Sequence, residues 1–138
     1  MREFFDAYAR AADSVDLTFF ESAYAETFMF AGPGGVQAVK RDDFLKVLPR
    51  RKAFFASIGL TGTQLSRLDE TTLDELHSMV RVEWALRFEK APGPPIVDQS
   101  SATYVLRRSD ASAQIVFQID HQDLTKRAQA LGLIPEQA

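Results

Sequence analysis

The chain has 138 residues, of which 46% are hydrophobic, an ordinary proportion for a folded globular protein. Its length suits one domain with a core of its own, so we expect residues 1–138 to form a single domain. The net charge of −3 and the pI of about 5.4 argue against binding to nucleic acid or to an anionic membrane surface. The absence of cysteine excludes disulfides, thiolate metal sites and a cysteine nucleophile.

No apolar run approaches the roughly 18 residues that a transmembrane helix needs. Residues 1–13 carry acidic side chains among the apolar ones and lack the continuous apolar stretch of a secretory signal. We therefore expect a cytoplasmic protein that does not bind membranes.

Two helices are expected at the start of the chain. Over residues 3–13 the apolar side chains recur at three- and four-residue spacing, as on one face of a helix. These side chains are Phe4, Phe5, Tyr8 and Ala12. Asp16 is a good N-cap for a second helix over residues 17–23, because its carboxylate can accept from an unpaired backbone N–H of the first turn.

A short strand over residues 26–31 is expected to turn at Gly32-Pro33-Gly34-Gly35 and to return over residues 36–39. A third helix should open at Asp42 and Asp43, since acidic side chains complement the N-terminal end of the helix dipole. We expect this helix to kink or restart at Pro49 and to end at Gly59. Its basic triplet, residues 50–52, is interpreted as a solvated face.

The clearest pattern in the sequence is the alternation of residues 79–89, MVRVEWALRFE. A period of two predicts a long antiparallel strand with one buried face. Further strands are expected over residues 63–72, 99–108 and 113–121, and a helix over residues 122–131 that ends at Gly132 and Pro135. The stiff loop 91–95 and the turn 109–112 separate the last strands. Helices followed by a curved antiparallel or mixed sheet give an α+β fold.

This order of elements resembles the NTF2-like superfamily with its cystatin-like cone, which includes the ketosteroid isomerases and SnoaL-type cyclases. The pieces that carry the resemblance are Tyr8, Asp16, Tyr24-Ala25, Pro33, Val82-Glu83 and Val105-Leu106-Arg107. The resemblance implies a curved sheet that wraps around the N-terminal helices and encloses an apolar cavity. It also implies a homodimer joined through the sheet.

The ketosteroid isomerases offer a specific test of this resemblance. Their mechanism uses an Asp base just before a Pro, together with a Tyr and a protonated Asp that hold the oxyanion. In an ungapped alignment the Tyr position is kept at Tyr8, the second acid falls on Tyr104, and the base falls on Gly32. Because glycine cannot accept a proton, we reject steroid-isomerase chemistry by that mechanism.

Strand alternation and the helical stripes predict which side chains line the cavity. The predicted lining is Phe20, Phe28, Phe30, Phe54, Phe55, Val82, Trp84, Leu86, Ala102, Leu106, Phe117 and Ile119. The same residues could equally form a closed core. Ile115 is also expected to face inward, in a lined cavity and in a closed core alike.

Tyr8, Tyr104 and His121 are the candidate catalytic residues, because they bring polar groups to this apolar lining. His121 is the best acid/base candidate, since the pKa of imidazole lies near neutrality. Asp120 is a weaker candidate that should point to the opposite face from His121. With two distant histidines and no cysteine, no metal site is expected, and no cofactor is indicated.

Three functions remain open at this point. The first is a binding domain for an apolar small molecule with one or two oxygens, which could be an isomerase, cyclase or dehydratase. The second is a non-catalytic homodimeric module whose cavity is filled by its own aromatic side chains. The third is a protein adaptor like the transport factor that names the superfamily.

Overall fold

The computed structural model describes residues 1–90, 93–109 and 112–133 of the chain. The predicted stop at Pro135, part of the loop 91–95 and part of the turn 109–112 lie outside the described residues. The elements follow the order α-α-β-β-α-β-β-β-β-α, as the sequence predicted. The helices are α1 (Arg2–Ser14), α2 (Leu17–Ala23), α3 (Arg41–Ser57) and α4 (Leu124–Ala130). The strands are β1 (Tyr24–Gly32), β2 (Gly35–Lys40), β3 (Leu60–Thr72), β4 (His77–Phe88), β5 (Ile96–Ser109) and β6 (Ser112–Asp120).

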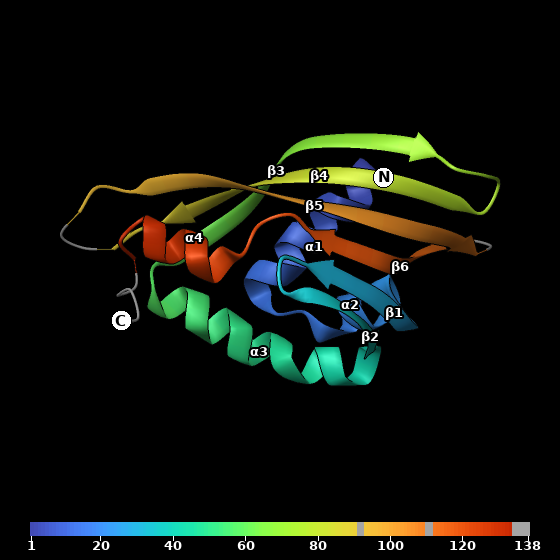
Figure 1. Cartoon of the computed structure of the whole chain (residues 1–138), viewed down its shortest axis with the longest axis horizontal. Helices are drawn as coiled ribbons and strands as arrows, with labels where there is room; N and C mark the ends of the chain where they lie inside the picture. The colour runs from blue at the N-terminus through green and yellow to red at the C-terminus, as the bar shows by residue number, and fades with distance from the viewer. Residues whose placement is uncertain (91–92, 110–111, 134–138) are drawn as a thin grey trace.

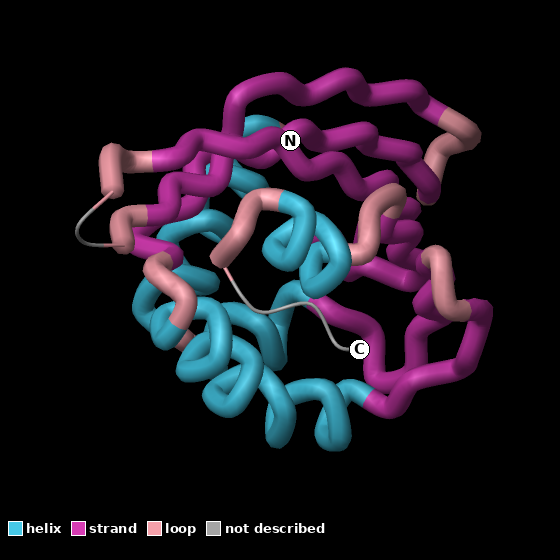
Figure 2. The backbone as a smooth tube through the Cα atoms, turned by 60° about the vertical axis from the view of Figure 1, so that its left-hand side comes forward, coloured by secondary structure: helices cyan, strands magenta, loops and turns pink. Residues whose placement is uncertain are grey.

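The six strands form one mixed sheet in the order β2-β1-β6-β5-β4-β3. Only the β1–β6 pair is parallel among the described strand pairs, and the others are antiparallel. The sheet curves, and α1, α2 and α3 lie against its concave face (Figures 1 and 2). This arrangement confirms the predicted α+β class with a curved mixed sheet around the N-terminal helices.

The alternating strand β4 divides the molecule into an inner and an outer side. Val80 and Val82 have no exposed surface, and Trp84 is 7% exposed, whereas Arg81 and Arg87 are exposed. Because successive side chains of a strand point to opposite faces, the apolar set packs on the helices and the charged set lies on the outer face.

The helix boundaries follow from local capping. The Asp16 carboxylate accepts a hydrogen bond of 3.3 Å from the backbone N–H of Phe19, which confirms the predicted N-cap of α2. Gly59 follows the end of α3 with a φ of 102°, the conformation expected of a residue that ends a helix. Helix α3 runs without a break through Pro49, so the predicted restart is wrong. Pro49 is exposed, and its ring leaves the carbonyl of Leu45, one turn earlier, without a backbone N–H donor.

A β-bulge in β6 changes which of its side chains face the helices. Val105 pairs with Phe117 and Leu106 pairs with Ile115, so Val116 is an extra residue on β6. One extra residue reverses the alternation beyond it. Ile115 is therefore buried as predicted, but after the bulge Gln118 and Asp120 face inward, and the predicted inward positions of Phe117 and Ile119 are wrong.

The C-terminal helix α4 packs beside the first half of β5. Arg127 forms a two-bond ion pair with the nearly buried Asp98 at 2.8 and 2.9 Å, and Ala128 has no exposed surface. The predicted span 122–131 is longer than α4, because Gln122 precedes the N-cap residue Asp123 and bonds to Ser101 instead. Among the described residues, no helix has the length and apolar character to cross a membrane.

Candidate functional site

A cavity of about 850 Å³ lies between the concave face of the sheet and α3. Side chains from α1 and α2 close one side of it, and side chains from β2 and α4 border the other. The aromatic side chains of the core therefore do not fill the interior of the cone. Nine of the sequence candidates line this cavity: Tyr8, Phe20, Phe28, Phe30, Phe55, Trp84, Leu86, Ala102 and Tyr104.

Five predicted lining residues lie elsewhere. Val82 and Leu106 face inward but are fully buried in the core outside the cavity. Phe54 is 41% exposed, because it lies one position, about 100° of helix turn, from the inward Phe55. Phe117 and Ile119 lie on the outer face as a result of the bulge at Val116.

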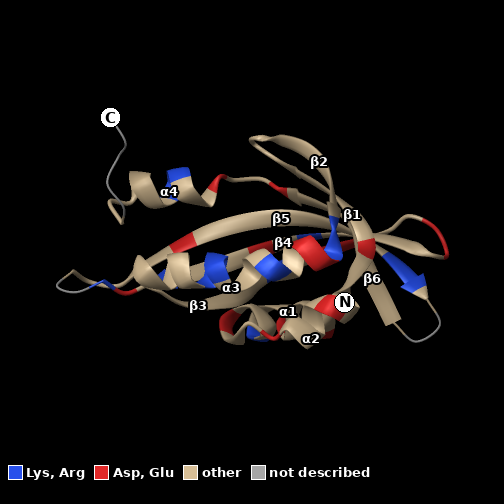
Figure 3. Cartoon of the chain, turned by 90° about the horizontal axis from the view of Figure 1, so that it is seen from below, with Lys and Arg blue, Asp and Glu red and all other residues tan. Residues whose placement is uncertain are grey.

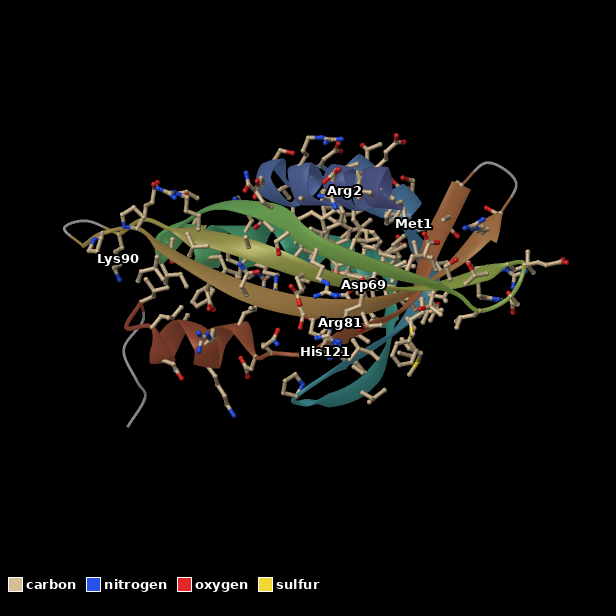
Figure 4. The ribbon with its side chains drawn as sticks, turned by 90° about the horizontal axis from the view of Figure 1, so that it is seen from above. Met1, Arg2, Asp69, Arg81, Lys90 and His121 are labelled. Carbon is tan, nitrogen blue, oxygen red and sulfur yellow. The ribbon has the colours of Figure 1, made fainter. Side chains whose placement is uncertain are left out.

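His121 also lies outside the cavity. Its side chain is exposed, and its Nε2 atom lies 2.7 Å from the Thr103 hydroxyl on the outer side of the sheet. Figure 4 labels His121 and Arg81, and Thr103, which contacts His121, is the strand partner of Arg81 in the pairing of β4 with β5. The prediction of His121 as the acid/base group of the cavity is therefore wrong, because the bulge places its neighbour Asp120 there instead.

A chain of hydrogen bonds runs through the buried end of the cavity. The hydroxyls of Tyr8 and Tyr24 are 2.7 Å apart, the Tyr24 hydroxyl donates to Oε1 of Gln118 at 2.5 Å, and Nε2 of Gln118 donates to Oδ1 of Asp120 at 2.9 Å. An amide oxygen only accepts, so the Tyr24 proton is committed to Gln118. Tyr8 must then donate to Tyr24, and the whole chain is directed toward Asp120.

Burial changes the acidity of the groups in this chain. It raises the pKa of the Asp120 carboxyl above its ordinary value, while the hydrogen bond from Gln118 and the charge of Arg51 act in the opposite direction. Burial likewise raises the pKa of Tyr8, and it raises the pKa values of Tyr24 and Tyr104 well above the ordinary value. The three phenols are therefore neutral hydrogen-bonding groups at physiological pH, and Asp120 is a more basic carboxylate than an exposed one.

Aromatic packing holds the phenols in place. The Tyr8 ring stacks on Trp84 with a centroid distance of 5.6 Å and an interplanar angle of 24°. Tyr104 lies 4.9 Å from Phe5 and 5.8 Å from Tyr8, centroid to centroid. Phe5 has no exposed surface, so the side of the Tyr104 ring toward α1 is closed to solvent. Such packing restricts the motion of the hydroxyls that face the cavity.

Sequence reasoning missed three members of this site. Tyr24 entered the sequence analysis through the family resemblance and not as a site residue, but it begins β1, and its hydroxyl is part of the hydrogen-bond chain. Gln118 gave no signal, because a glutamine in a strand is ordinarily a surface residue. Arg51 is exposed, as a solvated face requires, but it also borders the cavity, and its guanidinium lies 5.0 Å from the Phe55 ring centroid.

Within residues 1–90, 93–109 and 112–133, no group of three or more histidine, aspartate or glutamate side chains is arranged to hold a metal ion. The polar groups that the cavity does hold are phenols, amides, a carboxylate and a guanidinium. These groups can hydrogen-bond an oxygen of a ligand or exchange a proton with it.

Comparison with solved structures identifies the fold. An NTF2-like protein of unknown function from Shewanella oneidensis has a TM-score of 0.68 and 15% identity, over 87% of this chain and 94% of its own. An NTF2-like protein with a cystatin-like fold from Novosphingobium aromaticivorans has a TM-score of 0.69 and 20% identity, over 98% of this chain and 86% of that protein. The chain has the NTF2-like fold. The β subunit of a benzoate 1,2-dioxygenase from Burkholderia mallei is also similar to this chain, with a TM-score of 0.66 and 14% identity, over 91% of this chain and 89% of that subunit.

No protein-family model matches the sequence, and no curated protein sequence matches it significantly. At these identities the structural likeness establishes the NTF2-like fold alone, so function must be argued from the cavity.

Proposed function

We propose that this NTF2-like domain binds an apolar small molecule that carries an oxygen, and that Asp120 exchanges a proton with it. The observation that carries the proposal is the hydrogen-bond chain from Tyr8 to Asp120 along the wall of a cavity of about 850 Å³. A cavity of this size with an aromatic lining and a few convergent polar groups is typical of small-molecule sites.

Asp120 takes the role of the base in this proposal. The ketosteroid isomerase base falls on Gly32, whose position for a Cβ is 3.8 Å from the Asp120 carbonyl oxygen. The backbone of Asp120, on the neighbouring strand β6, therefore lies beside Gly32, and its side chain lines the cavity. Burial raises the pKa of Asp120 toward neutral pH. A base whose pKa lies nearer the working pH takes a proton from carbon more efficiently.

The proposed reaction is an isomerisation by way of an enolate. The Asp120 carboxylate takes a proton from the carbon next to a ligand carbonyl, and the electron pair of the broken C–H bond moves onto the carbonyl oxygen. The Tyr104 hydroxyl, which borders the cavity, donates a hydrogen bond to that oxygen. For a ligand with a C=C bond in the β,γ position to the carbonyl, the intermediate is a dienolate. Asp120 then returns the same proton to its γ carbon as the double bond shifts into the α,β position, so no oxidant or reductant is needed.

The partner that we propose is a second copy of this chain, bound through the outer face of the sheet. On this face Met29, Phe117, Val105 and Met79 lie in register across β1, β6, β5 and β4. None of these side chains is buried, and Met79 is 38% exposed. A row of apolar side chains across four strands is an unusual surface for a monomer.

Sedimentation velocity tests this interface. The native protein should sediment as a dimer, and Phe117→Glu should sediment as a monomer.

Ligand binding is tested first by thermal shift against steroids, aromatic polyketides and fatty acids. A ligand at a hundred times its Kd adds about 2.7 kcal/mol to the free energy of unfolding. The control is Ala102→Leu, which reduces the space in the cavity without adding charge. Stabilisation of the native protein that is lost in Ala102→Leu supports the site, whereas equal stabilisation of both places the ligand elsewhere.

Proton exchange is tested with 2-tetralone, an aromatic ketone with acidic carbon-bound protons. NMR in D2O follows the replacement of these protons by deuterium. We expect the native protein to accelerate the exchange and Asp120→Asn to lose most of the acceleration. Exchange that is unchanged in Asp120→Asn would contradict the assignment of the base, even if binding is retained.

A further inference from the structure

A second cavity, of about 460 Å³, adjoins the first on the side of β2 and α4. It is bordered by the turn that contains Gly32, Gly34 and Gly35 and by the residues that lead into α4. Arg51, Phe55 and Asp120 line both cavities. We call the place where these three residues lie the neck, because it joins the aromatic inner cavity to the outer one.

Arg51 is the only basic side chain that lines both cavities within the described residues. Basic side chains follow α3 beyond its acidic first turn (Figure 3). The guanidinium of Arg51 lies 5.0 Å from the ring centroid of Phe55, which is 7% exposed. Stacking on a ring holds a guanidinium in place. Its N–H groups point outward in the guanidinium plane and stay available to bind a ligand.

Those N–H groups have no acidic partner in the part of the chain that the structure describes. The ion pairs of the described residues do not include Arg51, and neither do their side-chain hydrogen bonds. The charge of Arg51 nevertheless reaches the site, because it helps to lower the pKa values of Asp120 and Tyr8 against the effect of burial. A planar cation at the neck of an aromatic cavity can therefore bind a planar anion in two-bond geometry.

We propose that the ligand is a carboxylic acid whose carboxylate binds Arg51 at the neck while its apolar part occupies the inner cavity. This inference rests on the proposed binding function and narrows it to a substrate class. The glycines of the β1–β2 turn leave room beside Arg51, since no atom lies within 4 Å of the Cβ positions of Gly34 and Gly35. The carboxylate must lie on the Arg51 side of the neck, because Asp120 would repel it on the other side.

The other charged side chains of the inner cavity do not offer the same site. Lys40 and Lys52 line the inner cavity but not the outer one. Asp13 and Asp43 line it as well, and their negative charges oppose the binding of an anion near those lysines. In the outer cavity the charged side chains besides Arg51 are the acidic Asp120 and Asp123.

The test compares carboxylic acids with their primary amides, which have nearly the same shape but no charge. The probes are 2-naphthoate with 2-naphthamide and dodecanoate with dodecanamide, and their affinities are measured by calorimetry near pH 7. For the native protein we expect the acid to bind at least roughly tenfold more tightly than its amide, as for a charge-assisted two-bond contact. In Arg51→Gln this ratio should fall close to one, and Arg51→Lys should keep part of it.

Arg50→Gln is the matched control. It removes the same charge from the adjacent position of α3, which lines neither cavity. A preference for acids that survives in Arg51→Gln, or that falls equally in Arg50→Gln, overturns the inference. Acids and amides that bind the native protein equally also overturn it, while leaving the proposed binding function intact. If neither acids nor amides bind, the proposed function itself fails.

Discussion

The Tyr24 hydroxyl donates a hydrogen bond to Oε1 of Gln118 at 2.5 Å, and this bond joins β1 to β6 across 94 residues of sequence. Tyr24 has no exposed surface and Gln118 is 7% exposed, so neither group can turn to water if the other is removed. The bond fixes the amide plane of Gln118. That plane in turn aims Nε2 at Asp120, which makes the strand pair part of the candidate site.

Removing both sides of this bond should destabilise the fold by less than the sum of the two separate removals. Gln118→Leu leaves a buried hydroxyl without its acceptor, at a cost of roughly 1–3 kcal/mol. Tyr24→Phe combined with Gln118→Leu removes both polar groups, and we expect the double variant to lose less than the sum of the single variants. Urea unfolding of the four proteins gives the coupling free energy, and strict additivity would mean that the two side chains do not interact.

The raised pKa of Asp120 predicts how stability depends on pH. Between the pKa of the unfolded chain, near 3.9, and the higher folded value, the native state binds more protons than the unfolded state. The contribution of Asp120 is therefore fully present below the unfolded pKa and is lost as the pH rises through the folded value. Asp120→Asn has no such loss, so its free energy of unfolding relative to the native protein should increase from pH 3 to pH 7.

Chemical unfolding of both proteins at several pH values provides the measurement. Asp123→Asn serves as the control, because it makes the same substitution three residues away, at a carboxylate that caps α4 and takes no part in the hydrogen bond between Gln118 and Asp120. A difference between Asp120→Asn and the native protein that stays constant over this range would show that burial does not perturb Asp120.

The ion pair of Arg127 with Asp98 should hold α4 in place beside the cavity. Arg127 lowers the pKa of the Asp98 carboxyl, chiefly through its hydrogen bonds, so the stabilisation is present above the unfolded pKa and is lost as the pH falls through the folded value. In Asp98→Asn we expect the amides of α4 to exchange several-fold faster with solvent at pH 7. The amides of β4 serve as the internal reference, and equal acceleration there would mean global rather than local opening.

Gly59 is expected to tolerate no side chain. Its φ of 102° is strained for any other residue, and an added Cβ would lie 2.8 Å from the carbonyl oxygen of Glu89. Because the contact is with backbone, it cannot relax by a rotamer change. Gly59→Ala should cost roughly 1–3 kcal/mol in thermal or urea unfolding. Gly34→Ala, where nothing lies within 4 Å, is the matched control and should be nearly neutral.

Local patterns in the sequence predicted most of the elements. The alternation of residues 79–89 predicted β4 and its buried face, and Asp16 predicted the start of α2, because both signals depend on neighbours only a few residues away. The resemblance to the NTF2-like superfamily also gave the correct fold. Tyr8 and Tyr104 were correctly placed beside the cavity, since each lies on a regular helix or strand whose periodicity is unbroken.

The remainder of the site depended on tertiary pairing. The bulge at Val116 lies where β6 pairs antiparallel with β5 and parallel with β1, and both pairings change register between Ile115 and Phe117. No local pattern in residues 112–120 signals that shift, so sequence periodicity favoured His121 where the fold presents Asp120. Short-range periodicity predicted most elements and the apolar faces of the regular ones. Which polar groups meet in the cavity depends on long-range pairing, because it requires contacts between residues as far apart as Tyr24 and Gln118.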